Sequence, residues 1–364
     1  MKKIKRMKFL TLFAFSFRSF LELNSTQNLF ITRSNAKVIK KYEHKQTDET
    51  SIKVLFPNPR TEDESGQATS LPEPRPVPFG LINIMATCYF NSVLQVLYAS
   101  PIFRDQISAE GAQGGRICDG VRNIFRVMEN KEDSLVPSIV NFCITEIAKT
   151  FEAKDRCDRD DILAGTQCDA VDLIDTVINV ICREHPEFKD TFSFLTKTIK
   201  CSKDPLHTNH SDLNVVIELP VNSNNMQDCV ASRLVDEKIE SWKCKECDDK
   251  LPATRIFNLQ TNDILVLSLA RFKYSPALNY FTKLYDEVSY DDFLVIDETT
   301  YRLIAIVKHC GYIDGGHYVA TVLGADGKWY TQNDDKTKCH GSFIASKEHD
   351  KDNTPYIFIY ERIH

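Results

Sequence analysis

Apolar residues recur at helical spacing through the first half of the chain. The apolar positions at residues 93–97 mark a helix that begins after Thr87, a good N-cap residue, and ends before Pro101. The same period recurs in three further stretches, residues 120–129, 136–151 and 170–181. We therefore predict a helix-rich first half.

The second half changes to the apolar runs that are typical of strands. The clearest runs are Asn214–Leu219, Asp263–Phe272, Tyr301–Val307 and Tyr356–Tyr360. Helices first and strands later predict an α+β domain.

The amino-terminal part of the chain follows neither pattern. A basic start, residues 1–6, precedes the apolar run from Phe9 to Phe17, which has the charge and length of a secretory segment but is too short to span a bilayer. Arg18 follows directly, without a small-residue cleavage site. Residues 24–78 lack sustained periodicity and end rich in proline. We expect residues 1–78 to be a disordered leader and linker, and residues 79–364 to form the folded domain.

The overall composition is that of a soluble protein. A chain of 364 residues with 42% hydrophobic and 26% charged residues can bury a large core. The net charge of −6 gives no basic field, so nucleic acid is a poor candidate partner and a cationic partner is easier to accommodate. The 12 cysteines are mostly spread singly, which favours reduced thiols and a cytoplasmic or nuclear location.

Cys88 lies where a loop becomes the first predicted helix. At a helix start, the unpaired amides and the positive end of the dipole favour a thiolate, which is the form that attacks a carbonyl carbon. Asn83, five residues upstream, could donate its side-chain amide to a developing oxyanion. Cys88 is therefore the candidate nucleophile, and the alternative is a small buried hydrophobe.

A candidate base follows the predicted strand at residues 301–307. A glycine-bearing turn leads to His317 at the start of the next strand, where an imidazole has little steric cover. His309, inside the preceding strand, fits a structural role. Asn333, followed by Asp334, could orient the imidazole through a hydrogen bond, as in a Cys-His-Asn triad.

Three cysteines suggest part of a metal site. Cys244 and Cys247 form half of a zinc ribbon, and Cys201 begins a possible second half, in which Asp204 stands where a further cysteine is needed. Two histidines could substitute only if the loop folds back, His207 and His210. Since structural zinc needs four ligands, we expect an incomplete site that binds less than one zinc per chain, and no required cofactor.

The block Gly80-Leu-Ile-Asn-Ile-Met-Ala-Thr-Cys88-Tyr-Phe-Asn-Ser-Val-Leu-Gln95 resembles the cysteine box of the ubiquitin-specific proteases. That box reads Gly-Leu-x-Asn-x-Gly-x-Thr-Cys-Tyr-x-Asn-Ser-x-x-Gln. Every fixed position fits except Met85, which stands where the family has glycine and bears on the backbone geometry of the turn.

Further blocks resemble the same family. Gln167-Cys-Asp-Ala-Val-Asp-Leu is similar to its Gln-Gln-Asp-Ala-x-Glu-Phe box, with Cys168, Asp172 and Leu173 as departures. Gly315-Gly-His-Tyr318 resembles the histidine box. Trp329-Tyr-Thr-Gln-Asn-Asp334 fits its companion Trp-x-x-x-Asn/Asp-Asp, with Gln332 replacing an aromatic residue. The resemblance covers residues 79–364.

This resemblance implies a papain-like fold with thumb, palm and fingers. It also implies a thiol-dependent hydrolase that cleaves isopeptide or peptide bonds after the tail of ubiquitin or a ubiquitin-like modifier, through a thioester. The expected catalytic residues are Cys88, His317, Asn333, Asn83 and Asp334. Asp169 would hold the arginine-bearing tail, and Gln95 and Tyr318 are further residues expected to bind substrate.

Two other interpretations stay open. Met85, Gln332 and the incomplete ribbon suggest a decayed, non-catalytic ubiquitin-binding module, and the leader suggests a secreted papain-like peptidase. A cysteine-directed probe built on the ubiquitin tail separates them: the enzyme is labelled, the module binds without labelling, and an unrelated peptidase ignores the probe. Whether the modifier is ubiquitin or the interferon-induced ubiquitin-like protein is not decided by any motif.

Overall fold

The computed structural model describes residue 77 and residues 79–109, 115–210, 214–275, 279–312, 315–343 and 353–363. The chain divides into two units, residues 1–68 and 69–364, and only the second contains described residues. The predicted leader and linker, residues 1–78, therefore lie outside the described residues apart from Val77.

The first half of this unit is helical, as predicted. Its α-helices are α4 (Cys88–Ala99), α5 (Pro101–Ser108), α6 (Arg116–Glu129), α7 (Lys131–Ser134), α8 (Pro137–Ala148), α9 (Arg159–Leu163) and α10 (Ala170–Glu184), and the 3₁₀ helix η2 covers Pro186–Asp190. Helix α4 is mostly apolar all round, and 11 of its 12 residues are buried. It therefore lies at the centre, in contact with strands on one side and with α10 on the other.

The second half builds three sheets among the described residues. The largest has eight strands, β13 (Lys336–Cys339), β12 (Trp329–Asn333), β11 (Gly315–Leu323), β10 (Thr299–Tyr312), β14 (Asn353–Arg362), β6 (Ile264–Leu269) and β3 (Val216–Leu219) in that order, with β9 (Phe293–Ile296) paired to β10. A second sheet orders β2 (Thr208–His210), β1 (Phe194–Cys201), β5 (Lys250–Gln260) and β4 (Glu237–Lys243). The strands β7 (Phe272–Ser275) and β8 (Tyr280–Lys283) form a separate hairpin.

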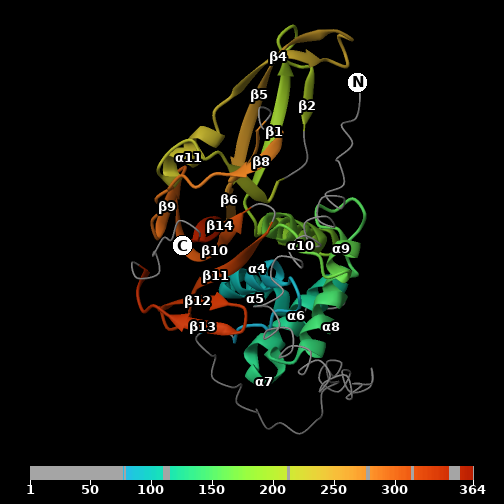
Figure 1. Ribbon diagram of the computed structural model, residues 1–364. Helices are drawn as coiled ribbons and strands as arrows, with labels where there is room; N and C mark the ends of the chain where they lie inside the picture. Colours follow the sequence, from blue (N-terminus) through green and yellow to red (C-terminus); the bar gives the residue numbers. More distant parts are fainter. Residues whose placement is uncertain are drawn as a thin grey trace. The chain divides into compact units, whose positions relative to one another are not determined.

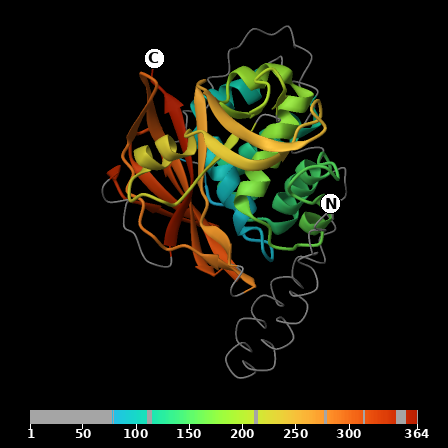
Figure 2. The same ribbon diagram turned by 90° about the horizontal axis from the view of Figure 1, so that it is seen from above.

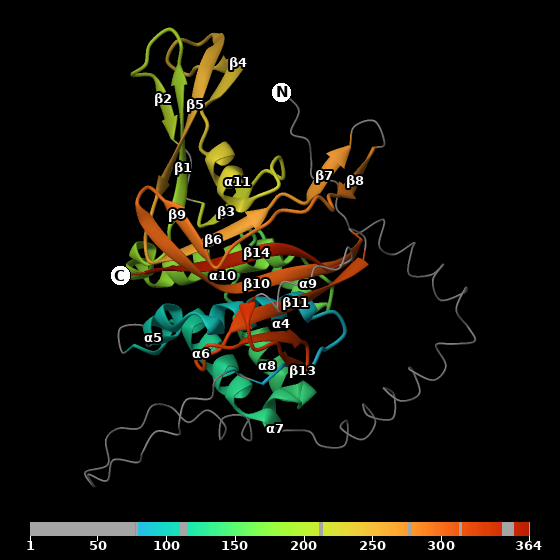
Figure 3. The same ribbon diagram turned by 90° about the vertical axis from the view of Figure 1, so that its left-hand side faces the viewer.

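The eight-stranded sheet divides the domain into layers. Helices α4, α6 and α8 lie on one side of it (Figures 2 and 3), with α4 packed directly on β10 and β11. On the other face, a buried cluster joins the sheet to α11 (Met226–Arg233). Burial on both faces explains the continuous apolar run of β6, all six residues of which are buried.

The four-stranded sheet extends from the end of the eight-stranded sheet, away from the helical layer (Figure 1). The helical layer, the large sheet and the extending sheet correspond to the expected thumb, palm and fingers. The fold is thus α+β, as the order of the elements predicted.

One predicted strand, Asp263–Phe272, is wrong as a single element. Strand β6 ends at Leu269 because Arg271 turns its side chain into the interior, where its Nε donates to the Pro355 carbonyl oxygen at 2.7 Å. A buried guanidinium needs such acceptors, and it interrupts the ladder before β7 begins.

In the described part of the chain, no helix is long and apolar enough to cross a membrane.

Candidate active site

Cys88 begins α4 and is 3% exposed. Side chains of the preceding turn hold it in place: the Thr87 amide donates to Asn83 Oδ1 at 3.0 Å, and the Ile84 amide donates to Thr87 Oγ1 at 2.9 Å. Thr87 occupies the N-cap position as predicted, but its hydroxyl caps no amide of the helix because it is turned back into the loop. The positive end of α4 therefore stays open to negative charge on Cys88.

Met85, the departure from the cysteine box, adopts the left-handed backbone of the glycine that it replaces. Its φ is +63°, and its side chain is 82% exposed. The thioether lies against Gly165, where a Cβ would come within 3.1 Å of Met85 Sδ. The turn keeps its glycine-type geometry at a conformational cost of about 1–2 kcal/mol.

His317 reaches Cys88 from the start of β11 and shares a side-chain hydrogen bond with it. Its Nε2 lies 2.7 Å from Asn333 Oδ1, at the end of β12. Because an amide oxygen only accepts, Nε2 carries the hydrogen and Nδ1 is left to face the sulfur. The hydrogen bond to Cys88, opposed by desolvation and assisted by the bond to Asn333, raises the pKa of His317 to about 9. The arrangement favours an imidazolium beside a thiolate.

Asp334 ties the end of β12 to the nucleophile turn. Its carboxylate accepts hydrogen bonds from Asn83 Nδ2 at 2.9 Å and from Asn91 Nδ2 at 3.0 Å, and it lies 3.8 Å from His317 Nε2. The chain passes so closely at Gly80 that a Cβ there would meet the Asp334 carbonyl oxygen at 2.1 Å. Asp334 therefore positions Asn83, whose amide uses one of its two hydrogens on this carboxylate.

Two amides of the site were missed by the sequence analysis. Asn91 donates to Asp334 and to the Leu81 carbonyl oxygen, so it joins α4 to the turn. Gln167 Nε2 donates to the Gly316 carbonyl oxygen at 2.7 Å and lies 3.6 Å from Cys88 Sγ. Both residues occupy fixed positions of the boxes quoted above, which was the signal available in the sequence.

Asp169 is the N-cap of α10, as its place before the acidic first turn suggested. Its carboxylate accepts from the Val171 amide at 2.7 Å and from the Tyr356 hydroxyl at 3.0 Å. Burial, followed by the nearby charge of Asp172, raises the pKa of Asp169 to about 6. The side chain is partly exposed and ionised at neutral pH, so it can accept a cationic partner.

Two residues assigned to substrate binding are instead buried. Tyr318 is 5% exposed and stacks on Tyr356 beneath Asp169, so it supports that carboxylate from inside. Gln95 is 2% exposed and donates to the Phe79 carbonyl oxygen at 3.2 Å. The prediction failed for both because a motif does not separate packing residues from surface residues.

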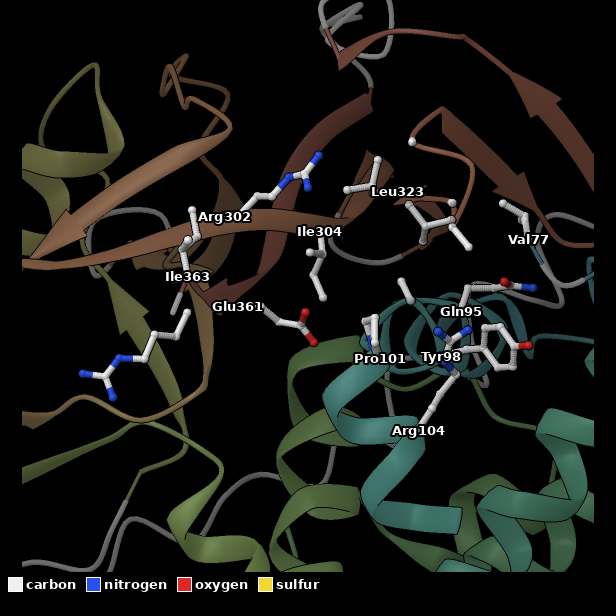
Figure 4. A pocket seen from close by; sticks show the side chains of 16 residues that line it. Val77, Gln95, Tyr98, Pro101, Arg104, Arg302, Ile304, Leu323, Glu361 and Ile363 are labelled. Atoms are coloured by element: carbon white, nitrogen blue, oxygen red, sulfur yellow. The ribbon is translucent and has the colours of Figure 1, made fainter. Parts of the chain in front are cut away.

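Gln95 lies at the far end of α4 from Cys88. It lines a cavity of about 440 Å³ together with Tyr98, Arg104 and Glu361 (Figure 4). The lining includes neither Cys88 nor His317.

His309 is a structural residue, as expected. It is 3% exposed, and burial, assisted by Lys283, lowers its pKa to about 3, so the ring is neutral. It packs under the turn before His317: a Cβ on Gly316 would meet His309 Nε2 at 2.2 Å. This close approach explains the second glycine of the histidine box.

The predicted incomplete zinc set is wrong, because His207 supplies a fourth group. The ligand atoms of Cys201, His207, Cys244 and Cys247 all lie within 4.8 Å of one another. The loop after β1 folds back, with the Cys201 amide donating to the His207 carbonyl oxygen at 3.1 Å. This was the condition on which a histidine could complete the site.

The chemistry of this cluster fits zinc. Three cysteine sulfurs and one imidazole nitrogen form a common structural zinc set. His207 Nδ1 faces Cys247 Sγ at 3.3 Å, while its Nε2 lies 3.5 Å from the Asp204 carboxylate. A carboxylate behind a histidine fixes the ring orientation in metal sites, so Asp204 has a place in this cluster without being a ligand.

Taken together, the geometry defines a papain-like cysteine hydrolase with a Cys-His-Asn arrangement. A model of the family described as "Ubiquitin carboxyl-terminal hydrolase" matches residues 79–360. The chain therefore belongs to this family, which confirms the resemblance found in the sequence and the class of enzyme that it implied.

Individual relatives agree with this assignment. The chain is 27% identical over 305 residues to ubiquitin carboxyl-terminal hydrolase 12 of Salmo salar, covering 71% of this chain and 80% of that protein. It is 28% identical over 287 residues to ubiquitin carboxyl-terminal hydrolase 48 of Danio rerio, covering 71% of this chain but only 27% of that protein.

Solved structures show the same fold. The Ubp8/Sgf11/Sus1/Sgf73 module of SAGA bound to ubiquitin aldehyde matches with a TM-score of 0.61 and 19% identity, over 79% of this chain and 70% of the other. The same module with a Ubp8 variant, bound to monoubiquitin, matches with a TM-score of 0.60 and 20% identity, over 79% and 69%. These matches confirm the papain-like fold class.

Proposed function

We propose that residues 79–364 form the catalytic domain of a cysteine deubiquitinase. It hydrolyses the isopeptide or peptide bond that follows the tail of ubiquitin or a ubiquitin-like modifier. The observation that carries this proposal is the contact of Cys88 with His317, itself held by Asn333, in a chain of this family.

Each residue has a defined step. The Cys88 thiolate attacks the carbonyl carbon at the end of the tail, and the Asn83 amide donates to the oxyanion that forms. His317 gives its proton to the leaving amine as the C–N bond breaks, which leaves a thioester. His317 then takes a proton from water, whose oxygen attacks the thioester and releases the tail carboxylate and the thiolate.

Asp169 is proposed to hold an arginine of the tail. Its carboxylate is oriented by the Tyr356 hydroxyl and the Val171 amide before substrate arrives. Orientation in advance lowers the entropy cost of a charge-assisted pair.

The structure removes the observations that favoured a decayed module. Met85 keeps the turn, and His207 completes the ribbon. Gln332 is 2% exposed and accepts from the Thr337 hydroxyl, so it packs inside the sheet and does not disturb the site.

The test is a probe that carries a thiol-reactive group at the end of the ubiquitin tail. We expect covalent labelling at Cys88, located by peptide mass spectrometry among the 12 cysteines. Parallel labelling with the interferon-induced modifier identifies the preferred tail. Binding without labelling would leave only the non-catalytic module, and no interaction would reject the family function for this chain.

We further propose that the finger cluster binds a structural zinc, and we expect about one zinc per purified chain. This reverses the expectation from sequence, because the fourth ligand is present. His207→Ala should lower the zinc content and the melting temperature, since metal bound only to the folded state stabilises it. The measurements are elemental analysis and thermal unfolding with and without a chelator.

His210→Ala is the matched control for zinc. His210 lies in the same loop but is exposed, and its ring contacts the hydroxyls of Thr198 and Thr208. Zinc content and chelator sensitivity should not change in this variant. Wild-type protein without zinc, or equal zinc in His207→Ala, would reject the assignment.

The pH dependence follows from His317. Its pKa of about 9 means that the imidazolium needed to protonate the leaving amine is lost as the pH rises through 9. We expect kcat/KM to fall on the alkaline side near that pH. Asn333→Ala removes a hydrogen bond that raises this pKa, so its alkaline limb should begin at lower pH. Identical alkaline limbs in the two proteins would contradict the role of Asn333.

The cellular location stays a proposal. All 12 cysteines are free thiols in the structure, which fits a reducing compartment, the cytoplasm or the nucleus.

A further inference from the structure

The side chain of Gln167 lies between the nucleophile and the strand that carries the base. Its Nε2 is 2.7 Å from the Gly316 carbonyl oxygen and 3.6 Å from Cys88 Sγ. A carbonyl oxygen only accepts, so the amide must present its NH₂ group on this side. That group has two hydrogens, one for each neighbour.

The loop that carries Gln167 is fixed from both ends. The Thr166 amide donates to the Asp161 carbonyl oxygen at 2.9 Å, and Gly165 turns the chain with a φ of +72°. On the other side, Asp169 caps α10 two residues later. The amide therefore reaches the sulfur on a backbone that is already ordered.

Gln167 also reaches the sulfur where Asn83 does not. Among the described residues, the side chains in hydrogen-bonding contact with Cys88 Sγ are Gln167 and His317. The Asn83 amide is instead held on Asp334 at 2.9 Å. In the free enzyme, Gln167 is thus the neutral donor beside the reacting sulfur.

We propose that Gln167 is a catalytic residue that stabilises the Cys88 thiolate by donating a hydrogen bond to Sγ. A bond to an ionised acceptor is stronger than one to a neutral group, so it favours thiolate over thiol. The same bond stabilises the sulfur as it leaves the thioester. This inference rests on the role of Cys88 as nucleophile, and it does not depend on which modifier is the substrate.

The test follows alkylation of Cys88 by iodoacetamide against pH, with the modified peptide quantified by mass spectrometry. In Gln167→Leu, the rate at neutral pH should fall about ten-fold, and the pH of half-maximal rate should rise by about one unit. At high pH, where the thiol is ionised without help, the rate should return to that of wild type. No substrate is needed, so failure of the proposed deubiquitinase activity would leave this result readable.

A matched control separates this role from simple loop anchoring. Gln227 likewise donates its amide to a backbone carbonyl, that of Val295 at 2.8 Å, but does not contact the nucleophile. Gln227→Leu should leave the alkylation profile unchanged. An unshifted profile in Gln167→Leu would overturn the proposal. A loss of rate that persists at high pH would also overturn it, because it would show displaced structure and not a less ionised sulfur.

Discussion

Cys88→Ala is expected to abolish hydrolysis while the protein still binds the modifier. The substitution removes the only atom that can form the thioester, and loss of a nucleophile in comparable sites costs roughly a million-fold in kcat. Cys88 is 3% exposed, so the missing sulfur leaves a small gap at the start of α4 and no unpaired charge. Binding should persist because the tail is held elsewhere, at Asp169 in our proposal. Turnover is measured on a fluorogenic substrate, and binding by calorimetry.

Cys118→Ala is the control for this variant. Cys118 is fully buried in α6, and burial raises its pKa to about 12, so it is an unreactive thiol. Its replacement should leave kcat unchanged. Residual turnover in Cys88→Ala would remove the central claim, and loss of binding together with turnover would show that the helix start had collapsed.

The catalytic residues could be predicted because their positions depend on local sequence. Cys88 follows a turn built from residues four and five positions away, and His317 and Asn333 lie on neighbouring strands joined by a short connection. The α+β order of the elements followed from periodicity alone.

Features that depend on distant contacts could not be read in the same way. The fourth zinc group is an example: His207 faces Cys247 only because the loop after β1 folds back. Gln95 and Tyr318 belong to the motifs but pack inside, and burial is set by neighbours from β14 and from the start of the domain. The contact of Gln167 with Cys88 joins residues 79 positions apart.

Asn83→Ala is expected to lower kcat by roughly a hundred- to a thousand-fold, about 2.7–4 kcal/mol, with KM nearly unchanged. The side-chain oxygen of Asn83 accepts from the Thr87 amide, and one amide hydrogen is held by Asp334. The other hydrogen remains for the oxyanion, which exists only in the transition state. Because Met85 keeps the left-handed turn, the spacing between Asn83 and Cys88 needed for this role is preserved.

Asn91→Ala separates oxyanion donation from the support of Asp334. Asn91 donates to the same carboxylate at 3.0 Å, but from inside α4, where it is 3% exposed and cannot meet a substrate oxygen. If Asn83 acts on the oxyanion, its variant should lose far more kcat than Asn91→Ala, whose main effect should be on thermal stability. Equal losses of kcat would show that both residues act through Asp334. A loss below about fivefold in Asn83→Ala, around 1 kcal/mol, would leave the oxyanion to backbone amides and withdraw the assignment of Asn83, while that of Cys88 would stand.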